Sequence, residues 1–285
     1  MLYVGCPMWA HRPWVGRHLP TDTRVGRELY AYSRAFNAVE GNTTFYASPA
    51  VSTVAKWCEQ AHPDFRFVFK VPRHITHDRR LRGVDADLNA FCSLMAPLGE
   101  RVGGFTLQLP ASFGPTDLGA LESVLRHAST AWRWSVEVRH SAFFEGESRV
   151  RLEQMLQRYG AERVLLDTGP LFAAPPTTDE GREEWDQKPK LPSLTEALTD
   201  QPIVRCVGND DPDITAAGVA RWAPIVAEWL DDGRSPTFFV HTPSNLDTPQ
   251  FVRDFHAAVR ALVPSVSALP SLPTPEPAPE QGSLF

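Results

Sequence analysis

Charged and amide side chains recur where short apolar runs end, and their types suit the binding and protonation of a polar molecule. The stretch Phe36–Tyr46 is the first example, because it begins as an alternating strand and puts Glu40 and Asn42 on one face where the strand stops. A carboxylate in that position requires a partner. It either forms an ion pair with a nearby Lys or Arg, or acts as a general acid or base at the mouth of a parallel sheet.

Similar polar residues follow the later strands. Glu137 and Arg139 lie two residues apart in Trp-Ser-Val-Glu-Val-Arg-His, so we expect both to point into one interior. The full set expected to converge at the strand ends is Glu40, Asn42, Lys70, Gln108, Glu137, Arg139, Asp167, Arg205 and His241, with His140 at the rim. Because its carboxylates and cations balance, the set also fits an ion-pair lattice that only fills the interior.

The residue types suggest two roles in a site. Lys70, Arg139 and Arg205 would hold an anion, since Arg makes bidentate contacts with phosphate and carboxylate. Histidines titrate near neutral pH and burial can raise the pKa of a Glu, so these groups would move protons. The predicted catalytic residues are Glu40, His77, Glu137, Asp167 and His241. The predicted substrate-binding residues are Trp9, Trp14, Asn42, Tyr46, Lys70, Gln108, Arg139, His140 and Arg205.

The aromatic members of this set lie in the loops after the first two strands. Trp9, Trp14 and Tyr46 would stack on a base or sugar, or else cap the mouth of the fold. A divalent metal held by the carboxylates and histidines is a further alternative. No His-Glu-x-x-His or similar spacing supports a metal, so no cofactor is evident from the sequence.

Eight strand-like runs alternate with segments of helical period over most of the chain. The expected strands are residues 2–6, 38–42, 65–71, 104–109, 134–138, 163–167, 203–207 and 237–241. This alternation indicates parallel strands joined by right-handed crossovers, and eight such units predict an α/β fold of the (β/α)8 TIM-like barrel type. An open doubly wound sheet is the alternative, but no Gly-x-Gly-x-x-Gly follows the first strand, which argues against a nicotinamide cofactor.

Two connections are longer than a barrel requires. Both follow a strand, which places them on the face where barrel active sites lie. Residues 72–84 carry a dense basic run that is either a solvated face or a phosphate-binding surface. Residues 168–192 are rich in Pro and charge, and would form either a lid over the site or a surface insertion.

The composition excludes several classes of protein. The 285 residues are 42% hydrophobic and 22% charged, which is typical of a globular protein. The net charge of −6 argues against broad nucleic-acid coating, although a local basic patch can still hold phosphate. With no apolar stretch of membrane-spanning length and no signal peptide, we expect a cytoplasmic protein without a membrane partner. The four separated cysteines indicate reduced thiols.

The chain changes character near its carboxyl end. Six prolines follow Leu262, which favours a disordered, extended linker. We therefore predict a barrel over residues 1–262, a Pro-rich linker over 263–280 and a separate short peptide over 281–285. That peptide, Gln-Gly-Ser-Leu-Phe, ends in two large apolar side chains that suit a partner protein.

Two resemblances add to this interpretation. The blocks concerned are residues 5–9 with Trp14, then 36–46, 69–70, 75–77, 107–110, 136–140, 204–205 and 241–243. Together they resemble the YecE-like family, domain of unknown function 72, which implies a TIM-like barrel but no particular activity. Residues 281–285 are similar to the pentapeptide by which bacterial polymerases and repair proteins dock on the DNA sliding clamp. That likeness implies clamp contacts by Gln281, Leu284 and Phe285.

Three functions follow from these patterns. The favoured one is an enzyme that acts on a phosphate-bearing substrate, DNA or a nucleotide, with hydrolase-like or phosphodiesterase-like acid/base chemistry, tethered to the sliding clamp. The second is a metabolic enzyme for a sugar-like or phosphorylated small molecule. The third is a module that binds nucleic acid or a metabolite without catalysis.

Overall fold

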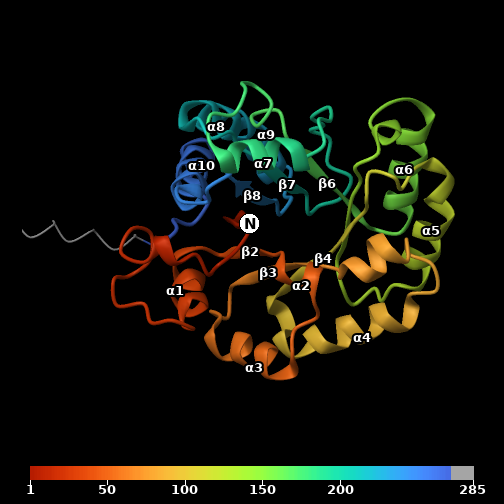
Figure 1. Cartoon of the computed structure of the whole chain (residues 1–285), viewed down its shortest axis with the longest axis horizontal. Coiled ribbons are helices and arrows are strands. Elements are labelled where there is room, and N and C mark those ends of the chain that lie inside the picture. Colours follow the sequence, from red (N-terminus) through yellow and green to blue (C-terminus); the bar gives the residue numbers. More distant parts are fainter. Residues whose placement is uncertain (271–285) are drawn as a thin grey trace, which may run out of the picture.

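Short runs of β-branched and aromatic residues form the strands, as their propensities predict. In the computed structural model, which describes residues 1–270, eight parallel strands close into a barrel in which each strand pairs with the next and the last pairs with the first (Figure 1). The strands are β1 Tyr3–Cys6, β2 Ala38–Gly41, β3 Arg66–Lys70, β4 Val102–Gln108, β5 Trp134–Glu137, β6 Glu162–Asp167, β7 Ile203–Val207 and β8 Thr237–His241. The predicted (β/α)8 barrel is therefore confirmed.

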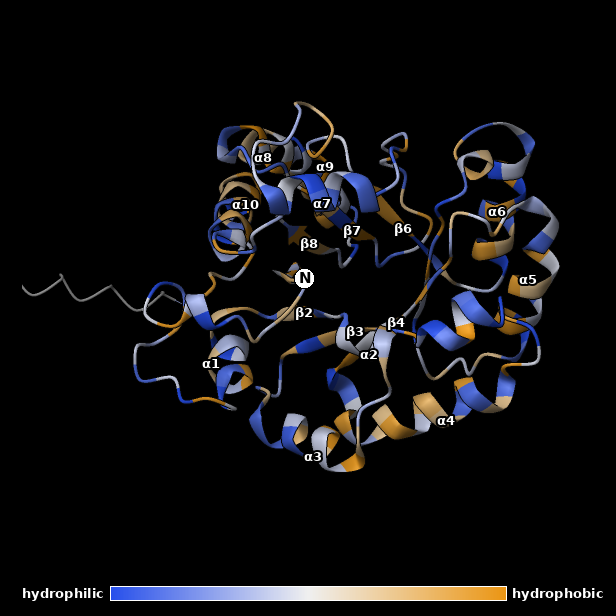
Figure 2. Cartoon of the chain, viewed as in Figure 1, coloured by the Kyte–Doolittle hydropathy of each residue, from blue (hydrophilic) through white to orange (hydrophobic). Residues whose placement is uncertain are grey.

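The helices occupy the connections between strands. They are α1 Glu28–Ala35, α2 Thr43–Tyr46, α3 Val51–Gln60, α4 Asp85–Met95, α5 Leu118–His127, α6 Gly146–Arg158, α7 Asp179–Gln187, α8 Pro212–Ala220, α9 Trp222–Asp231 and α10 Thr248–Leu262. The longer helices bury an apolar stripe on the outside of the barrel. In contrast, α7 is largely hydrophilic along its length (Figure 2).

Alternation along each strand separates the outer core from the barrel interior. Val39, Phe69 and Val136 belong to the large apolar core between strands and helices. Inside the barrel, Ala38, Val68 and Phe239 form a small apolar cluster of their own. Because side chains repeat every two residues, the next inward residues towards the strand ends form a layer above this cluster.

The carboxyl-terminal part of the described chain lies against α10. Val263 is buried, Arg260 donates a hydrogen bond to the Val266 carbonyl over 3.1 Å, and Arg253 donates one to the Pro270 carbonyl over 2.7 Å. The first eight residues of the predicted linker thus contact the barrel domain. Gln281, Leu284 and Phe285 lie outside the described residues. Within residues 1–270, no helix is long and apolar enough to span a membrane.

The closest backbone approach in the barrel wall is at Gly5. A Cβ on this residue would lie 2.0 Å from the carbonyl oxygen of Ala38 in the neighbouring strand β2. Real carbon and oxygen atoms do not approach so closely, so any side chain here would force β1 and β2 apart. Gly119 in α5 is the opposite case, because a Cβ there meets no atom within 4 Å.

We predict that Gly5→Ala lowers the free energy of unfolding by about 3 kcal/mol, since overpacking a rigid wall displaces both strands. Gly119→Ala is the matched control and should raise it by about 0.5 kcal/mol, because Ala restricts the unfolded chain at an open helical position. Urea unfolding at pH 7 measures both. Equal effects of the two substitutions would contradict the close approach of β1 and β2.

Candidate functional site

A buried guanidinium lies at the centre of the upper barrel. Arg205 on β7 is 2% exposed and lies between two carboxylates. Its Nη1 donates to Oε2 of Glu137 over 2.6 Å, and its Nε is 2.5 Å from Oε1 of Glu40. Oε1 of Glu137 in turn contacts Nε and Nη2 of Arg139, each at 2.8 Å. Both oxygens of Glu137 therefore face an arginine.

Glu40 connects this group to the other strands. Its Oε2 accepts a hydrogen bond from Asn42 over 2.8 Å and lies 3.1 Å from Nε2 of His241 and 3.9 Å from Nζ of Lys70. Lys70 donates to Oε1 of Gln108 over 2.6 Å. Below, "the charge cluster" denotes Glu40, Lys70, Glu137, Arg139, Arg205 and His241. The sequence analysis expected all of them to meet, and the structure brings them together.

The carboxylates of the charge cluster are ionised at neutral pH. Burial alone would raise the pKa of Glu137, but Arg205, Arg139 and Lys70 outweigh it and hold that pKa well below its usual range. At Glu40, burial also raises the pKa, but the charges of Arg205 and Lys70 outweigh it and lower the pKa of this carboxyl group well below its usual range. The expectation that burial raises these carboxyl pKa values toward neutrality is therefore wrong. Neither group can donate a proton at pH 7.

The basic members of the site behave differently. Burial, reinforced by Arg205, lowers the pKa of Lys70 to about 7 despite the opposing charge of Glu40. Burial also lowers the pKa of His77 and His241 to about 4, so both rings are neutral at pH 7. Lys70 is therefore the group of the charge cluster that titrates near neutrality. From the sequence, we expected Lys70 only to bind an anion.

A cavity of about 610 Å³ opens above the charge cluster. Its lining comes from loops and helices at the carboxyl ends of the strands, and comprises Pro7, Met8, Asn42, Thr43, Phe45, Tyr46, Lys70, Arg73, His77, Gln108, Arg139, Glu184, Gln187, Lys188, Arg205, His241, Thr242 and Asn245. His77 lies on a short π-helix, His74–Asp78, and its ring packs edge-on against Phe45. Such a volume accommodates a small polar molecule or one nucleotide.

The long connection after β6 forms one wall of the cavity. Its helix α7 and the residue after it contribute Glu184, Gln187 and Lys188 to the lining. Thr178 caps the start of α7 by accepting a hydrogen bond from the Gly181 amide over 3.0 Å. Part of the connection 168–192 therefore lies beside the cavity, and its role as a lid stays a prediction.

The basic run after β3 divides into two parts. Arg79 pairs with Asp87, while Arg80 and Arg82 both pair with Asp117. Those three arginines are neutralised on the outside of the barrel. Arg73 and His77 of this run line the cavity, and Arg73 pairs with Asp78 over 3.4 Å.

Asp167 does not join the charge cluster, although it was predicted as catalytic. Its side chain points outward and accepts hydrogen bonds from Nε1 of Trp222 over 2.8 Å and from Oγ of Ser193 over 2.9 Å. It also pairs with Arg221. The reason is the period of two along β6, which puts Arg163, Leu165 and Asp167 on the outer face. Its role is to join β6 to the helix layer.

Three predicted substrate-binding residues also lie outside the cavity lining. Trp14 is fully buried and donates from Nε1 to the Asn245 carbonyl over 2.8 Å. Trp9 packs edge-on against Trp57 and Phe67 on the outer surface of the barrel wall. His140 accepts a hydrogen bond from the Ala142 amide over 3.2 Å and starts a short 3-10 helix. In each case packing or capping accounts for the side chain. Tyr46, by contrast, lines the cavity and is 79% exposed.

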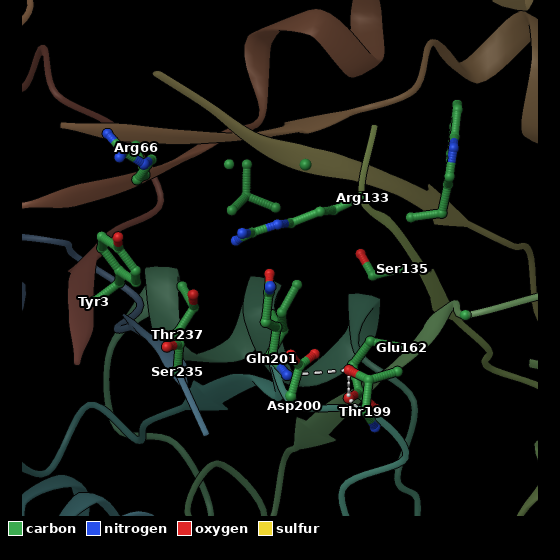
Figure 3. Close-up of a pocket in the computed structure, with 16 residues that line it drawn as sticks. Tyr3, Arg66, Arg133, Ser135, Glu162, Thr199, Asp200, Gln201, Ser235 and Thr237 are labelled. Carbon is green, nitrogen blue, oxygen red and sulfur yellow. Dashed lines mark hydrogen bonds between the residues drawn. The ribbon is translucent and has the colours of Figure 1, made fainter. Parts of the chain in front are cut away.

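A smaller cavity of about 100 Å³ lies at the amino-terminal ends of the strands (Figure 3). Glu162 lines this cavity, and burial raises the pKa of its carboxyl group. The Thr199 hydroxyl donates to this carboxyl over 2.6 Å, and the amides of Leu198 and Thr199 donate over 3.1 and 2.9 Å. These bonds satisfy Glu162 and hold the loop before β7.

Metal binding finds no support in the described residues. Among residues 1–270, no group of three or more His, Cys, Asp or Glu side chains is placed to hold an ion. The free thiols of Cys6, Cys92 and Cys206 are buried, and Cys58 is half-buried.

A closed (β/α)8 barrel defines a TIM-barrel protein, and here a charged cavity lies at the carboxyl ends of the strands. The chain belongs to the family described as "Protein of unknown function DUF72", whose model matches residues 3–278. It is 37% identical to the UPF0759 protein YecE of Escherichia coli K12 over 287 residues, with 100% of both chains covered. The YecE protein of Escherichia coli O157:H7 matches to the same extent.

Solved structures from two other bacteria share the fold. A DUF72 family protein from Enterococcus faecalis V583 superposes with a TM-score of 0.69 at 15% identity, covering 96% of this chain and 100% of that one. A DUF72 family protein from Thermotoga maritima MSB8 gives a TM-score of 0.67 at 21% identity, covering 88% and 97%. At these identities the likeness establishes the fold alone.

We predict that Glu137→Gln lowers the free energy of unfolding by about 3–5 kcal/mol at pH 7, because it leaves Arg205 and Arg139 buried with less compensation. Because the pKa of Glu137 is lowered in the folded state, its ionisation stabilises the fold fully at pH values above 4.5, the ordinary pKa of a Glu. That contribution is lost as the pH falls further, so the difference between wild type and variant should shrink towards pH 2.

Urea unfolding between pH 2 and 7 measures this dependence. Glu59→Gln is the control, because Glu59 makes only an exposed ion pair with Arg27 and should change stability by less than about 1 kcal/mol. A Glu137→Gln effect that is the same at pH 3 and pH 7 would show that the charge of Glu137 does not stabilise the barrel.

Proposed function

We propose that the cavity binds a phosphate-bearing substrate, a nucleotide or the end of a DNA strand, and that its polar residues carry out acid/base chemistry on it. The observation that carries this proposal is the charge of the lining. Five cationic side chains line the cavity, Lys70, Arg73, Arg139, Lys188 and Arg205. Among the described lining residues the carboxylate is Glu184, and Glu40 and Glu137 lie beneath. Lys188 pairs with Glu184 over 2.8 Å and Arg73 with Asp78 over 3.4 Å. Arg139, Arg205 and the partly protonated Lys70 therefore face two carboxylates, Glu40 and Glu137, which leaves a small excess of positive charge for an anion.

An ion-pair lattice that only fills the barrel explains less. Such a lattice has no need of an open cavity above it, and burying unneeded charges costs free energy. The side chain of Arg139 is 16% exposed and faces the cavity while Glu137 holds it in place. A guanidinium fixed in this way is pre-organised to bind phosphate oxygens.

The proton-transfer groups favour a hydrolase-like reaction. His77 lines the cavity, and its ring is neutral at pH 7. Its pKa of about 4 makes it a weak base there, and the negative charge of a bound phosphate would raise that pKa, so that His77 accepts a proton from an attacking water or hydroxyl. Arg139 and Arg205 would stabilise negative charge as it develops on the phosphate. Tyr46 at the rim offers an exposed ring on which a base can stack.

A phosphorylated small metabolite is the second candidate. The cavity volume of about 610 Å³ favours it equally, because that space suits one drug-sized molecule. Comparing the affinities for ribose 5-phosphate and for a nucleoside monophosphate distinguishes the two candidates, because only the nucleotide carries a base that can stack on Tyr46.

We expect Arg139→Met to weaken binding of nucleoside monophosphates and short single-stranded DNA by at least about tenfold, because a charge-assisted phosphate contact is lost. Isothermal titration calorimetry on the full chain measures this. Arg133→Met is the matched control, because Arg133 lines the cavity at the opposite end of the barrel. This variant should bind the nucleotides as tightly as the wild type does. If both variants bind equally well, the carboxyl-terminal cavity is not the phosphate site.

We also propose, on the sequence motif alone, that Gln281, Leu284 and Phe285 bind the DNA sliding clamp. Leu284 and Phe285 would enter an apolar pocket on the clamp. The variant Leu284→Ala with Phe285→Ala should abolish binding to immobilised clamp protein, while Gly282→Ala should retain it. If immobilised clamp protein retains the full chain and the double variant equally well, Leu284 and Phe285 do not bind the clamp.

A further inference from the structure

Arginine greatly outnumbers lysine in this protein. The sequence contains 24 arginines and four lysines, Lys56, Lys70, Lys188 and Lys190. Among residues 1–270, the other two fully buried cations are arginines, Arg163 and Arg205. Where a buried positive charge is needed, the chain therefore uses Arg, which never loses its proton. Lys70 is the exception, and Lys differs from Arg in being able to become a neutral amine.

The surroundings of Lys70 suit a reactive amine. Its Nζ lies at the base of the cavity, donates to Oε1 of Gln108 over 2.6 Å and is 3.9 Å from Oε2 of Glu40. Gln108 can therefore orient the amine towards the cavity. Burial and Arg205 lower the pKa of Lys70 to about 7, so about half of the side chains carry a free lone pair at pH 7.

The charges that act most strongly on Lys70 belong to the charge cluster. Arg205 and Arg139 disfavour its protonated form, whereas Glu40 and Glu137 favour it. Both arginines form ion pairs with carboxylates, Arg205 with Glu40 and Arg139 with Glu137. A cation at Nζ would still find Glu40 close by.

We propose that Nζ of Lys70 forms a Schiff base with an aldehyde or ketone carbonyl of the molecule held in the cavity. This inference rests on the second candidate of the proposed function, a phosphorylated small metabolite, because a nucleotide has no aldehyde or ketone carbonyl. The arginines around the cavity would hold the phosphate of that metabolite. It narrows the substrate class to phosphorylated carbonyl compounds. Desolvated lysines in apolar or cationic surroundings are known to act in this way in other enzymes.

The step balances without an oxidant or a metal. The ammonium releases one proton to water in the cavity, and the Nζ lone pair forms a bond to the carbonyl carbon while the π pair moves to oxygen. A second proton passes from nitrogen to that oxygen and gives a carbinolamine. The released proton then returns to the hydroxyl, which departs as water while the nitrogen lone pair closes the C=N bond. An iminium replaces the ammonium, so the charge beside Glu40 is unchanged.

Borohydride trapping with peptide mass spectrometry tests this inference. The full chain is incubated with glyceraldehyde 3-phosphate or dihydroxyacetone phosphate, reduced, and mapped at its four lysines. We expect Lys70 to be labelled at least about tenfold faster than Lys56, Lys188 or Lys190. Labelling should also rise about tenfold between pH 6 and pH 8, following the free amine. Uniform labelling of the lysines, or no labelling at Lys70, would overturn the inference.

Two variants and one probe separate this inference from the proposed function. Lys70→Arg keeps the positive charge and should lose the label, whereas Lys56→Arg, on the exposed face of α3 and outside the cavity lining, should keep it at Lys70. Wild-type labelling compared within one chain remains decisive if Lys70→Arg does not fold. Phosphate binding by calorimetry without any imine would overturn the Schiff base and leave the phosphate site standing. Equal trapping of glyceraldehyde and glyceraldehyde 3-phosphate would support the reactive amine and contradict the phosphate site.

Discussion

The upper half of this barrel depends on one buried guanidinium held between two carboxylates. Arg205 contacts Glu137 on one side and Glu40 on the other, so strands β2, β5 and β7 are joined across the barrel interior. These contacts keep both carboxylates ionised and hold Arg139 in position at the cavity. A buried ion pair by itself contributes little net stability, because removing its charges from water costs free energy. The contacts of Arg205 instead fix the positions of Glu40, Glu137 and, through Glu137, Arg139.

The same electrostatics set the reactivity of the site. Because Glu40 and Glu137 are committed to arginines, they cannot serve as acids at neutral pH. Burial leaves His77 neutral and leaves Lys70 with a pKa of about 7. In the proposed function, proton transfer and nucleophilic chemistry therefore belong to nitrogen atoms, while the arginines carry the fixed positive charge. This division of roles agrees with an anionic substrate whose reacting atom lies near Lys70.

The sequence allowed the barrel and most of the site to be predicted, for physical reasons. Strand and helix alternation and the period of two placed Glu40 and Glu137 inside, but at β6 the phase was assigned wrongly and Asp167 was expected inside. Trp14 could not be distinguished from a ligand-stacking residue, because its burial follows from loop packing that local patterns do not describe. The lowered pKa of Lys70 arises from four strands meeting, so it appears only once the fold closes. A lysine in an arginine-rich chain was the available signal.

Anomalous diffraction from crystals containing selenate, a tetrahedral analogue of phosphate, tests the central claim most directly. The account predicts a strong selenium peak in the carboxyl-terminal cavity, within hydrogen-bonding distance of Arg139 and close to Lys70. Selenium peaks confined to the opposite end of the barrel, beside Arg66 and Arg133, would contradict it. In that case the charge cluster would be a structural ion-pair lattice rather than the floor of an anion site.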